Sequence, residues 1–296
     1  MSLVINNNLM AMNAARNLAH SYGQLSTSTR RLSSGLRVGT AADDAAGLAI
    51  RELMRADIAS LNQGVRNAND AISMIQTADG ALQVIDEKLI RMKELAEQAA
   101  TGTYTSDQRL IIDSEYQAMA SEITRIANAT DFNGIHLLNG NLSSNEHDGS
   151  KLQATGKLKV HFGAGNDSAE DYYYIRIGNA TASALGVGNS SEKGPGYSVS
   201  TQQGAQQALE AINQAIVSKD NIRAHLGALQ NRLENTITNL QIQAENLQAA
   251  ESRISDVDVA NEMTNFVRNQ ILTQSAVAML AQANQLPQMA MQLMQG

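Results

Sequence analysis

The stretch from Asp43 to Ala100 reads DDAAGLAIRELMRADIASLNQGVRNANDAISMIQTADGALQVIDEKLIRMKELAEQAA and contains no proline. Its apolar residues recur at steps of four and three, a spacing that is typical of one side of a coiled-coil helix. Two successive steps of three around Ala78 shift the phase once. The stretch predicts a single helix, about 85 Å long at 1.5 Å per residue. The apolar positions are Leu61, Val65, Ala68, Ile72, Ile75, Ala78, Leu82, Ile85, Leu89, Met92, Ala96 and Ala99.

A helix of this length cannot enclose a core by itself, so it needs an equally long partner. A second run with the same spacing lies near the other end of the chain and provides that partner. Its positions are Ile222, Leu226, Leu229, Leu233, Ile237, Leu240, Ala244, Leu247 and Ile254. We expect the two runs to form one seam, with Leu61, Val65, Ile72, Leu82 and Leu89 meeting Leu226, Leu233, Leu240 and Leu247.

Shorter helices flank these two. Residues 4–34 predict a helix that ends at Gly35, and a break follows at residues 38–42. Three capping-box patterns mark helix starts: Thr40 with Asp43, Thr105 with Gln108 and Ser255 with Asp258. The second predicts a helix over residues 107–129, and the third predicts a last helix that reaches about residue 293.

The middle of the chain has a different character. Glycine, asparagine and serine accumulate in residues 133–200, beginning with the turn signal Asn133-Gly134. Two alternating runs, Lys157 to Phe162 and Tyr172 to Ile177, predict a β-hairpin. We expect this segment to lie at the far end of the helical bundle.

The predicted fold is therefore mainly α: an elongated, antiparallel, coiled-coil-like helix bundle formed by paired N- and C-terminal regions, with a small β-hairpin in the middle. We expect residues 1–42 and 255–296 to form an inner core of terminal helices. Residues 43–140 and 200–254 would form a rod-shaped bundle, to which the hairpin and loops of residues 141–199 belong.

Composition excludes several classes of function. The net charge of −7 argues against a nucleic-acid partner, and the absence of cysteine excludes disulfides and thiolate metal sites. The first eight residues lack the charged and apolar regions of a secretory signal peptide. Residues 269–296 carry no charge, but glutamines and Pro287 interrupt them, so we expect no membrane insertion.

No constellation of residues predicts catalysis. The five histidines are scattered, and no two of them stand four residues apart on one helix. Asp43 and Asp44 are explained better by a helix start than by a catalytic pair, because neighbours on a helix point about 100° apart. We expect no catalytic, cofactor or metal site, and a protein that is not an enzyme.

Both ends of the chain are too apolar and too poor in charge for ordinary solvated tails. They could pair only with each other inside one chain, or they could be buried by copies of the same chain in a polymer. We favour the polymer. The side chains expected to take part are Leu18, Tyr22, Leu25, Leu32, Met263, Phe266, Leu280 and Leu286.

Several motifs resemble bacterial flagellin. At the N-terminal end these are Ile5-Asn-Asn-Asn8, Arg31-Leu-Ser-Ser-Gly-Leu-Arg37 and Ala41-Ala-Asp-Asp-Ala-Ala-Gly-Leu-Ala-Ile50, followed by Phe132-Asn-Gly134. At the C-terminal end they are Ser252-Arg-Ile-Ser-Asp256, Gln270-Ile-Leu272 and Leu280-Ala-Gln-Ala-Asn-Gln285. The resemblance covers about residues 1–140 and 200–296. It is that of a short flagellin, without large outer domains.

This resemblance implies a structural subunit that polymerises into the helical filament of the bacterial flagellum for motility. The terminal helices would line its inner tube. The resemblance also implies export in an unfolded state through the flagellar type III apparatus, hence a secreted, extracellular protein. Implied partners are the chain itself, a secretion chaperone, the filament cap and the hook–filament junction proteins.

The resemblance further implies innate immune recognition. Residues 89–95 match the flagellin segment that a vertebrate Toll-like receptor contacts, which makes Arg91, Leu95 and Glu115 candidate receptor contacts. The alternative is that Arg91 and Glu115 form an ordinary surface ion pair and that Leu95 packs in the filament.

Two other functions remain open at this point. A hook–filament junction protein shares the helical ends but is present in few copies. A secreted helical effector would explain the charge-free C-terminus, although a basic amphipathic face is missing.

Overall fold

The computed structural model describes residues 8–150, 155–188 and 197–295, and for residues 155, 286–288 and 290–295 it describes the backbone alone. The chain packs as two units. We call Met1–Ile58 with Glu245–Gly296 the terminal unit, and Ala59–Ala244 the central unit. These boundaries lie inside two long helices, α2 (Ala45–Ala100) and α4 (Gln202–Ser255).

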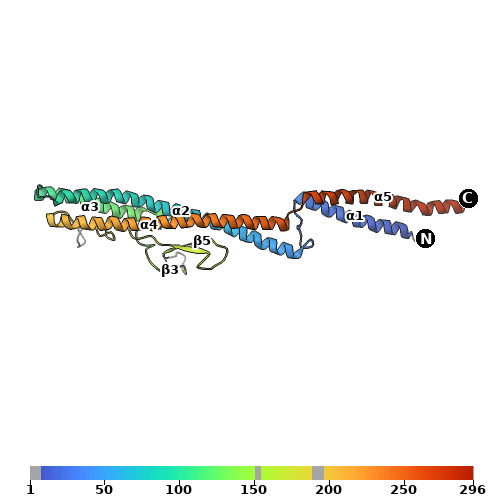
Figure 1. Cartoon of the computed structure of the whole chain (residues 1–296), viewed down its shortest axis with the longest axis horizontal. Helices are drawn as coiled ribbons and strands as arrows, with labels where there is room; N and C mark the ends of the chain where they lie inside the picture. The colour runs from blue at the N-terminus through green and yellow to red at the C-terminus, as the bar shows by residue number, and fades with distance from the viewer. Residues whose placement is uncertain (1–7, 151–154, 189–196, 296) are drawn as a thin grey trace. The chain divides into compact units, whose positions relative to one another are not determined.

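The central unit is built on the long helices and on α3 (Ser106–Ala129) (Figure 1). Arg109 at the start of α3 donates from Nε to the carbonyl of Ala99 at the end of α2. Further along, Arg91 of α2 bonds Glu115 of α3, so the two helices are antiparallel. α4 is also antiparallel to α2, because Arg223 pairs with Asp79 and Lys219 pairs with Asp86. The predicted antiparallel helix bundle is confirmed.

The apolar spacing of α2 becomes the core of the central unit. Every apolar position of α2 from Ala78 to Ala99 in the predicted seam is buried. Alanines at both ends of this run, Ala78 and then Ala96 and Ala99, let helices approach closely. One buried cluster joins α2 to α3 and α4. From these two helices it includes Ile112, Tyr116, Ala120, Ile123, Ala208, Ile212, Ala215, Leu226 and Leu233.

Where the structure describes it, the middle segment contains three antiparallel strand pairs. β1 (Asp131–Phe132) pairs with β2 (Ile135–His136) across a turn in which Asn133 and Gly134 both have positive φ. β3 (His147–Asp148) pairs with β4 (Thr155–Gly156). β5 (Leu158–His161) pairs with β6 (Tyr172–Ile175), which confirms the predicted hairpin with slightly shorter strands.

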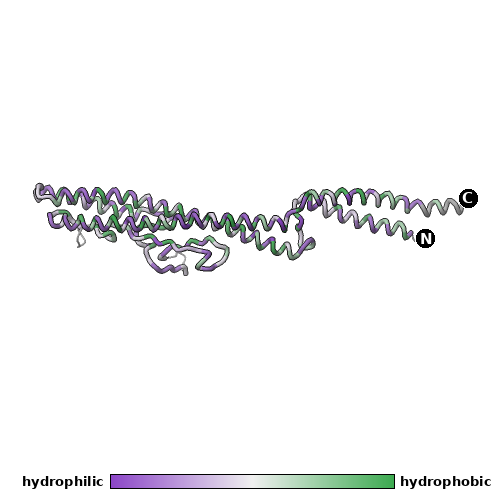
Figure 2. The backbone as a smooth tube through the Cα atoms, viewed as in Figure 1, coloured by the Kyte–Doolittle hydropathy of each residue, from purple (hydrophilic) through white to green (hydrophobic). Residues whose placement is uncertain are grey.

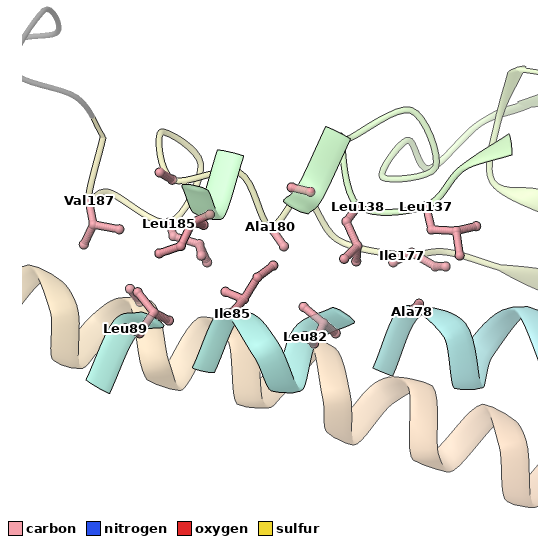
Figure 3. Close-up of a cluster of buried hydrophobic side chains, with 14 of the residues drawn as sticks. Ala78, Leu82, Ile85, Leu89, Leu137, Leu138, Ile177, Ala180, Leu185 and Val187 are labelled. Atoms are coloured by element: carbon pink, nitrogen blue, oxygen red, sulfur yellow. The ribbon is translucent and has the colours of Figure 1, made fainter. Parts of the chain in front are cut away.

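The expected place of this segment is wrong. It lies along the side of the helices rather than beyond their end (Figure 1). Leu137, Leu138, Ile177, Leu185 and Val187 are buried and point toward α2 (Figure 3). The phase shift of α2 coincides with this contact. At Ala78 the apolar side of the helix meets the middle segment as well as another helix (Figure 3).

A glycine allows the hairpin to touch α2 farther along. A Cβ on Gly64 would lie 1.9 Å from the carbonyl oxygen of Phe162, so no larger residue fits without movement. Three residues on, Asn67 donates from Nδ2 to the carbonyl of His161 over 2.8 Å.

The terminal unit pairs α1 (Leu9–Ser34) with α5 (Val259–Gln295). Asn8 caps α1 by accepting from the amide of Ala11, and its Nδ2 donates to the carbonyl of Ala283. α1 ends at Gly35, whose φ of 73° is the left-handed value that glycine adopts freely. The predicted start at residue 4 lies outside the described residues.

Two of the predicted capping boxes are wrong in detail. Asp43 accepts from the amide and hydroxyl of Thr40, but this closes a turn before the helix. α2 is capped by Asp44, which accepts from the amide of Gly47. Likewise α5 is capped by Asp258, which accepts from two amides, while α4 continues to Ser255.

Two loops of the terminal unit are joined by backbone hydrogen bonds. Leu36 and Asp256 form a single antiparallel bridge. The amide of Arg37 donates to the carbonyl oxygen of Ser255 over 2.7 Å. The amide of Val257 donates to the carbonyl oxygen of Gly35 over 2.9 Å. We call residues 35–44 and 256–258 the joint.

Candidate interaction surfaces

The terminal unit buries mainly polar side chains and exposes many apolar ones, the reverse of the usual distribution in a folded protein. Its buried side chains are mostly polar and include Ser28, Arg51, Glu262 and Asn269. Many large apolar side chains are exposed instead, which is uncommon in a protein that stays a monomer. Those on α1 and α5 are Leu9, Met10, Met12, Tyr22, Val259, Met263, Val267, Ile271, Leu272, Val277, Met279 and Met289. We call this set the terminal apolar surface.

On α5 this surface extends around the helix. Ile271 and Leu272 are both exposed, although neighbours on a helix point about 100° apart. Val277 adds a third direction, and Met279 lies on the same side as Leu272. Figure 2 shows hydrophobic residues recurring along α5. A helix with apolar side chains on several sides favours cover by other helices.

The contact between α1 and α5 is largely polar. A groove of about 690 Å³ between the two helices is lined by small residues such as Ala19 and Gly23, and by Arg31, Glu262 and Arg268. Arg31 lies 3.8 Å from Glu262. Because much of this contact is polar, many large apolar side chains of both helices remain exposed.

The predicted terminal residues fall into three groups. Leu18, Leu25, Leu32, Phe266 and Leu280 are half-buried between neighbouring side chains. Tyr22 and Met263 are exposed and belong to the terminal apolar surface. The side chain of Leu286 lies outside the described residues. Their role in assembly stays a prediction.

The predicted seam residues of the long helices are mostly covered. Leu61, Leu82, Leu89, Leu226, Leu233 and Leu240 are buried. Val65, Ile72 and Leu247 are half-buried.

A second surface lies where α2 meets α3. Arg91 donates to Glu115 from Nε over 3.0 Å and from Nη2 over 2.8 Å, and to Glu94 from Nη1 over 2.9 Å. The hydrogen bonds to Glu115, and next those to Glu94, raise the pKa of Arg91 above its usual value. Leu95 is only 2% exposed, so it packs in the core beneath this surface.

Exposed apolar side chains border this ion pair. Ile90 precedes Arg91, and Leu110 and Ile111 lie about one turn before Glu115 on α3. Ile111 is 70% exposed. A charged pair beside uncovered aliphatic groups is a typical arrangement for a protein contact.

The described residues contain no cluster of histidine, aspartate and glutamate placed to hold a metal ion. Within the same residues, no helix has the length and apolar character that a membrane span requires.

Comparison with known proteins identifies the family. The model of the bacterial flagellin N-terminal helical region matches residues 5–143, and that of the C-terminal helical region matches residues 209–294. The chain belongs to the bacterial flagellin family.

Relatives extend this match over the whole flagellin chain. Flagellin FlaB2 of Treponema pallidum is 40% identical over 99% of this chain and 100% of its own. Flagellin of Halalkalibacterium halodurans is 42% identical with the same coverage. The crystal structure of Bacillus cereus flagellin is 27% identical and covers 63% of this chain and 94% of its own, with a TM-score of 0.47.

Sequence reasoning missed two features of this flagellin. The apolar residues of the middle segment were not assigned to the core, because they follow no regular period. Lys219 was not singled out, although it is 1% exposed. Its burial depends on a carboxylate that is 133 residues distant in the chain, and no local pattern reveals such a partner.

Proposed function

We propose that this flagellin assembles by burying its terminal apolar surface against other copies of the chain. As a flagellin, the chain is a structural subunit of the bacterial flagellar filament. The observation that carries the proposal is the reversed distribution in the terminal unit, with polar residues inside and exposed apolar side chains on several sides of α5. Burial of apolar side chains contributes about 25 cal/mol per Å², so assembly would be strongly favourable.

The family resemblance supports a place for the terminal helices at the inner tube of the filament. There each α1 and α5 would be surrounded by helices of neighbouring subunits, which would cover α5 on all sides. The central unit has a core of its own and does not need such cover.

Delivery of the subunit to the growing end of the filament requires further partners, which the resemblance to flagellin suggests. We infer export of the unfolded chain through the flagellar type III apparatus to the extracellular side, where a filament cap and junction proteins would receive it. We also infer a chaperone that holds the last part of the chain before export, because an apolar α5 would otherwise associate prematurely.

The surface around Arg91 and Glu115 is our candidate for recognition by a vertebrate Toll-like receptor. The exposed ion pair and the neighbouring Ile90 and Ile111 support it. Leu95, which is buried, would act by supporting α2 rather than by touching a receptor in the folded subunit.

Assembly can be tested by single substitutions on α5. Ile271→Glu should abolish filaments seen by electron microscopy, because a carboxylate would have to enter an apolar contact. Gln241→Glu on α4 is the matched control, since it adds the same charge at an exposed polar position of the central unit, away from the terminal apolar surface. The circular dichroism of both variants should resemble that of the parent.

A second test removes the last forty residues. The product should remain soluble and helical but should not polymerise. Normal filaments from this truncated chain, or from the Ile271→Glu variant, would refute the proposal.

A further inference from the structure

The β5–β6 hairpin has two very different faces. Leu158, Val160 and Ile175 belong to the core cluster or pack against it. The alternate residues must point to the other face, because side chains alternate along a strand. In the register of the hairpin, Lys159 is paired with Tyr174 and His161 with Tyr172. We call Lys157, Lys159, His161, Tyr172 and Tyr174 the lysine–tyrosine face.

The lysines of this face are held by the tyrosine rings. The ammonium of Lys157 lies 4.1 Å from the ring centroid of Tyr174, and that of Lys159 lies 3.6 Å from the ring centroid of Tyr172. The two rings stand edge to face, with centroids 5.4 Å apart. These contacts restrict two normally mobile side chains, so a ligand would lose less entropy in ordering them.

The positive charge of this face is not neutralised internally. Among the described residues, no carboxylate forms an ion pair with Lys157 or Lys159, nor with the exposed Arg176 that follows β6. Arg176 donates to the amide oxygen of Asn145. These three cations stand close together on one hairpin of a chain whose net charge is −7.

Acidic side chains also lie near this face and keep their negative charge, among them Glu146 beside His147. Two others form hydrogen bonds within their own loops. The carboxylate of Asp148 accepts from the amide and hydroxyl of Ser150. That of Asp171 accepts from the amides of Gly165 and Asp167 and so closes the loop of the hairpin. Two histidines border the tyrosines, His147 beside Tyr174 and His161 beside Tyr172.

We propose that the lysine–tyrosine face, with Arg176, binds an anionic polysaccharide. Lys157 and Lys159 are alternate residues, about 6.6 Å apart along an extended chain, and Arg176 directly follows β6. A linear polymer that carries carboxylates or sulfates on successive units can engage several of these cations at once. The face presents cations, imidazoles and phenols but no aliphatic side chain. Tyrosine and arginine also suit a protein contact, so the test below includes an acidic polypeptide as a competing ligand.

The test measures binding of the full-length flagellin to immobilised heparin and polygalacturonate, with neutral dextran as the control polymer. We expect binding to at least one polyanion and none to dextran, and the affinity should fall as salt rises from 50 to 200 mM. The double variant Lys157→Gln/Lys159→Gln should weaken binding at least tenfold. Lys88→Gln/Lys93→Gln on α2 is the matched control, because it removes the same charge from another site.

Several results would overturn this inference. One is an equal loss of binding in the control variant, which would indicate general charge attraction. Another is binding to dextran as tight as to the polyanions. A third is tighter binding to polyglutamate or single-stranded DNA than to either polysaccharide, which would assign the face to an acidic protein or to a nucleic acid. Circular dichroism and thermal unfolding of each variant establish that the fold is unchanged.

Discussion

The ammonium of Lys219 on α4, which is almost fully buried, lies 2.5 Å from Oδ1 of Asp86 on α2. Asp220 provides a second carboxylate at 2.7 Å. One turn along α4, Arg223 pairs with Asp79 in the same antiparallel sense. Polar pairs inside an apolar seam fix the register of two helices, because sliding would leave the charges without partners.

Lys219→Met should destabilise the central unit by up to about 3 kcal/mol, since it leaves Asp86 without its partner. The partial exposure of Asp86 keeps the loss at the lower end of the range for buried pairs. Arg223→Met removes a more exposed pair and should cost about 1 kcal/mol or less. Denaturant unfolding of the full chain measures both. Equal losses would show that burial of Lys219 is unimportant.

Two glycines of α2 should respond in opposite ways to alanine. Gly64→Ala should destabilise by about 1–3 kcal/mol, because the new Cβ would collide with the carbonyl of Phe162. A Cβ on Gly80 would have no atom within 4 Å. Gly80→Ala should therefore stabilise the folded protein by about 0.5–1 kcal/mol, because alanine has a higher helix propensity. Thermal unfolding should rank the parent between the two variants. A neutral Gly64→Ala would mean that the hairpin does not rest on α2.

The start of α5 can be assigned by two substitutions. Asp258→Ala should cost about 1 kcal/mol, because the amides of Ala260 and Asn261 lose their acceptor. Ser255→Ala should cost little, because the hydroxyl of Ser255 is buried without a hydrogen-bond partner among the described residues. Denaturant unfolding measures both losses of stability. A larger loss for Ser255→Ala than for Asp258→Ala would indicate that Ser255 caps α5.

The stability that Asp43 gives to the joint should depend on pH. The hydroxyl of Thr40, assisted by its amide and by Arg30, lowers the pKa of Asp43 below the usual 3.8. The folded state therefore gains stability from ionised Asp43 above pH 3.8 and loses it as the pH falls through the lowered pKa. Thr40→Val should raise this pKa, which carbon NMR of the Asp43 carboxyl can follow. An unchanged titration would show that the hydroxyl does not contribute.

The sequence was informative where structure follows from regular spacing. The unbroken pattern from Leu61 to Ala99 predicted the long helix, and the alternation around Val160 predicted the hairpin. Gly35 and the Asn133-Gly134 turn were correct because each requires an unusual φ. Such signals depend on neighbours in the chain.

Other features depend on partners that are distant in sequence. Leu137 and Ile177 belong to the core only because the middle segment folds back on α2, and neither lies in a periodic run. Ser255 and Asp258 both suit a helix start, and the deciding factor is that α4 continues to Ser255. The family resemblance made Leu95 a candidate receptor contact, but it is only 2% exposed and belongs to the core cluster of the folded subunit.

The hydrogen bond between Asn8 and Ala283 joins residues separated by 275 positions. Contacts of such long range close late in folding, because the chain entropy of the intervening loop must be lost first. Within one subunit, α1 has no partner until α5, at the other end of the chain, has formed. The central unit, whose helices α2 and α3 are neighbours in sequence, can begin to form earlier. The subunit therefore acquires its terminal helix pair as the final event of its own folding.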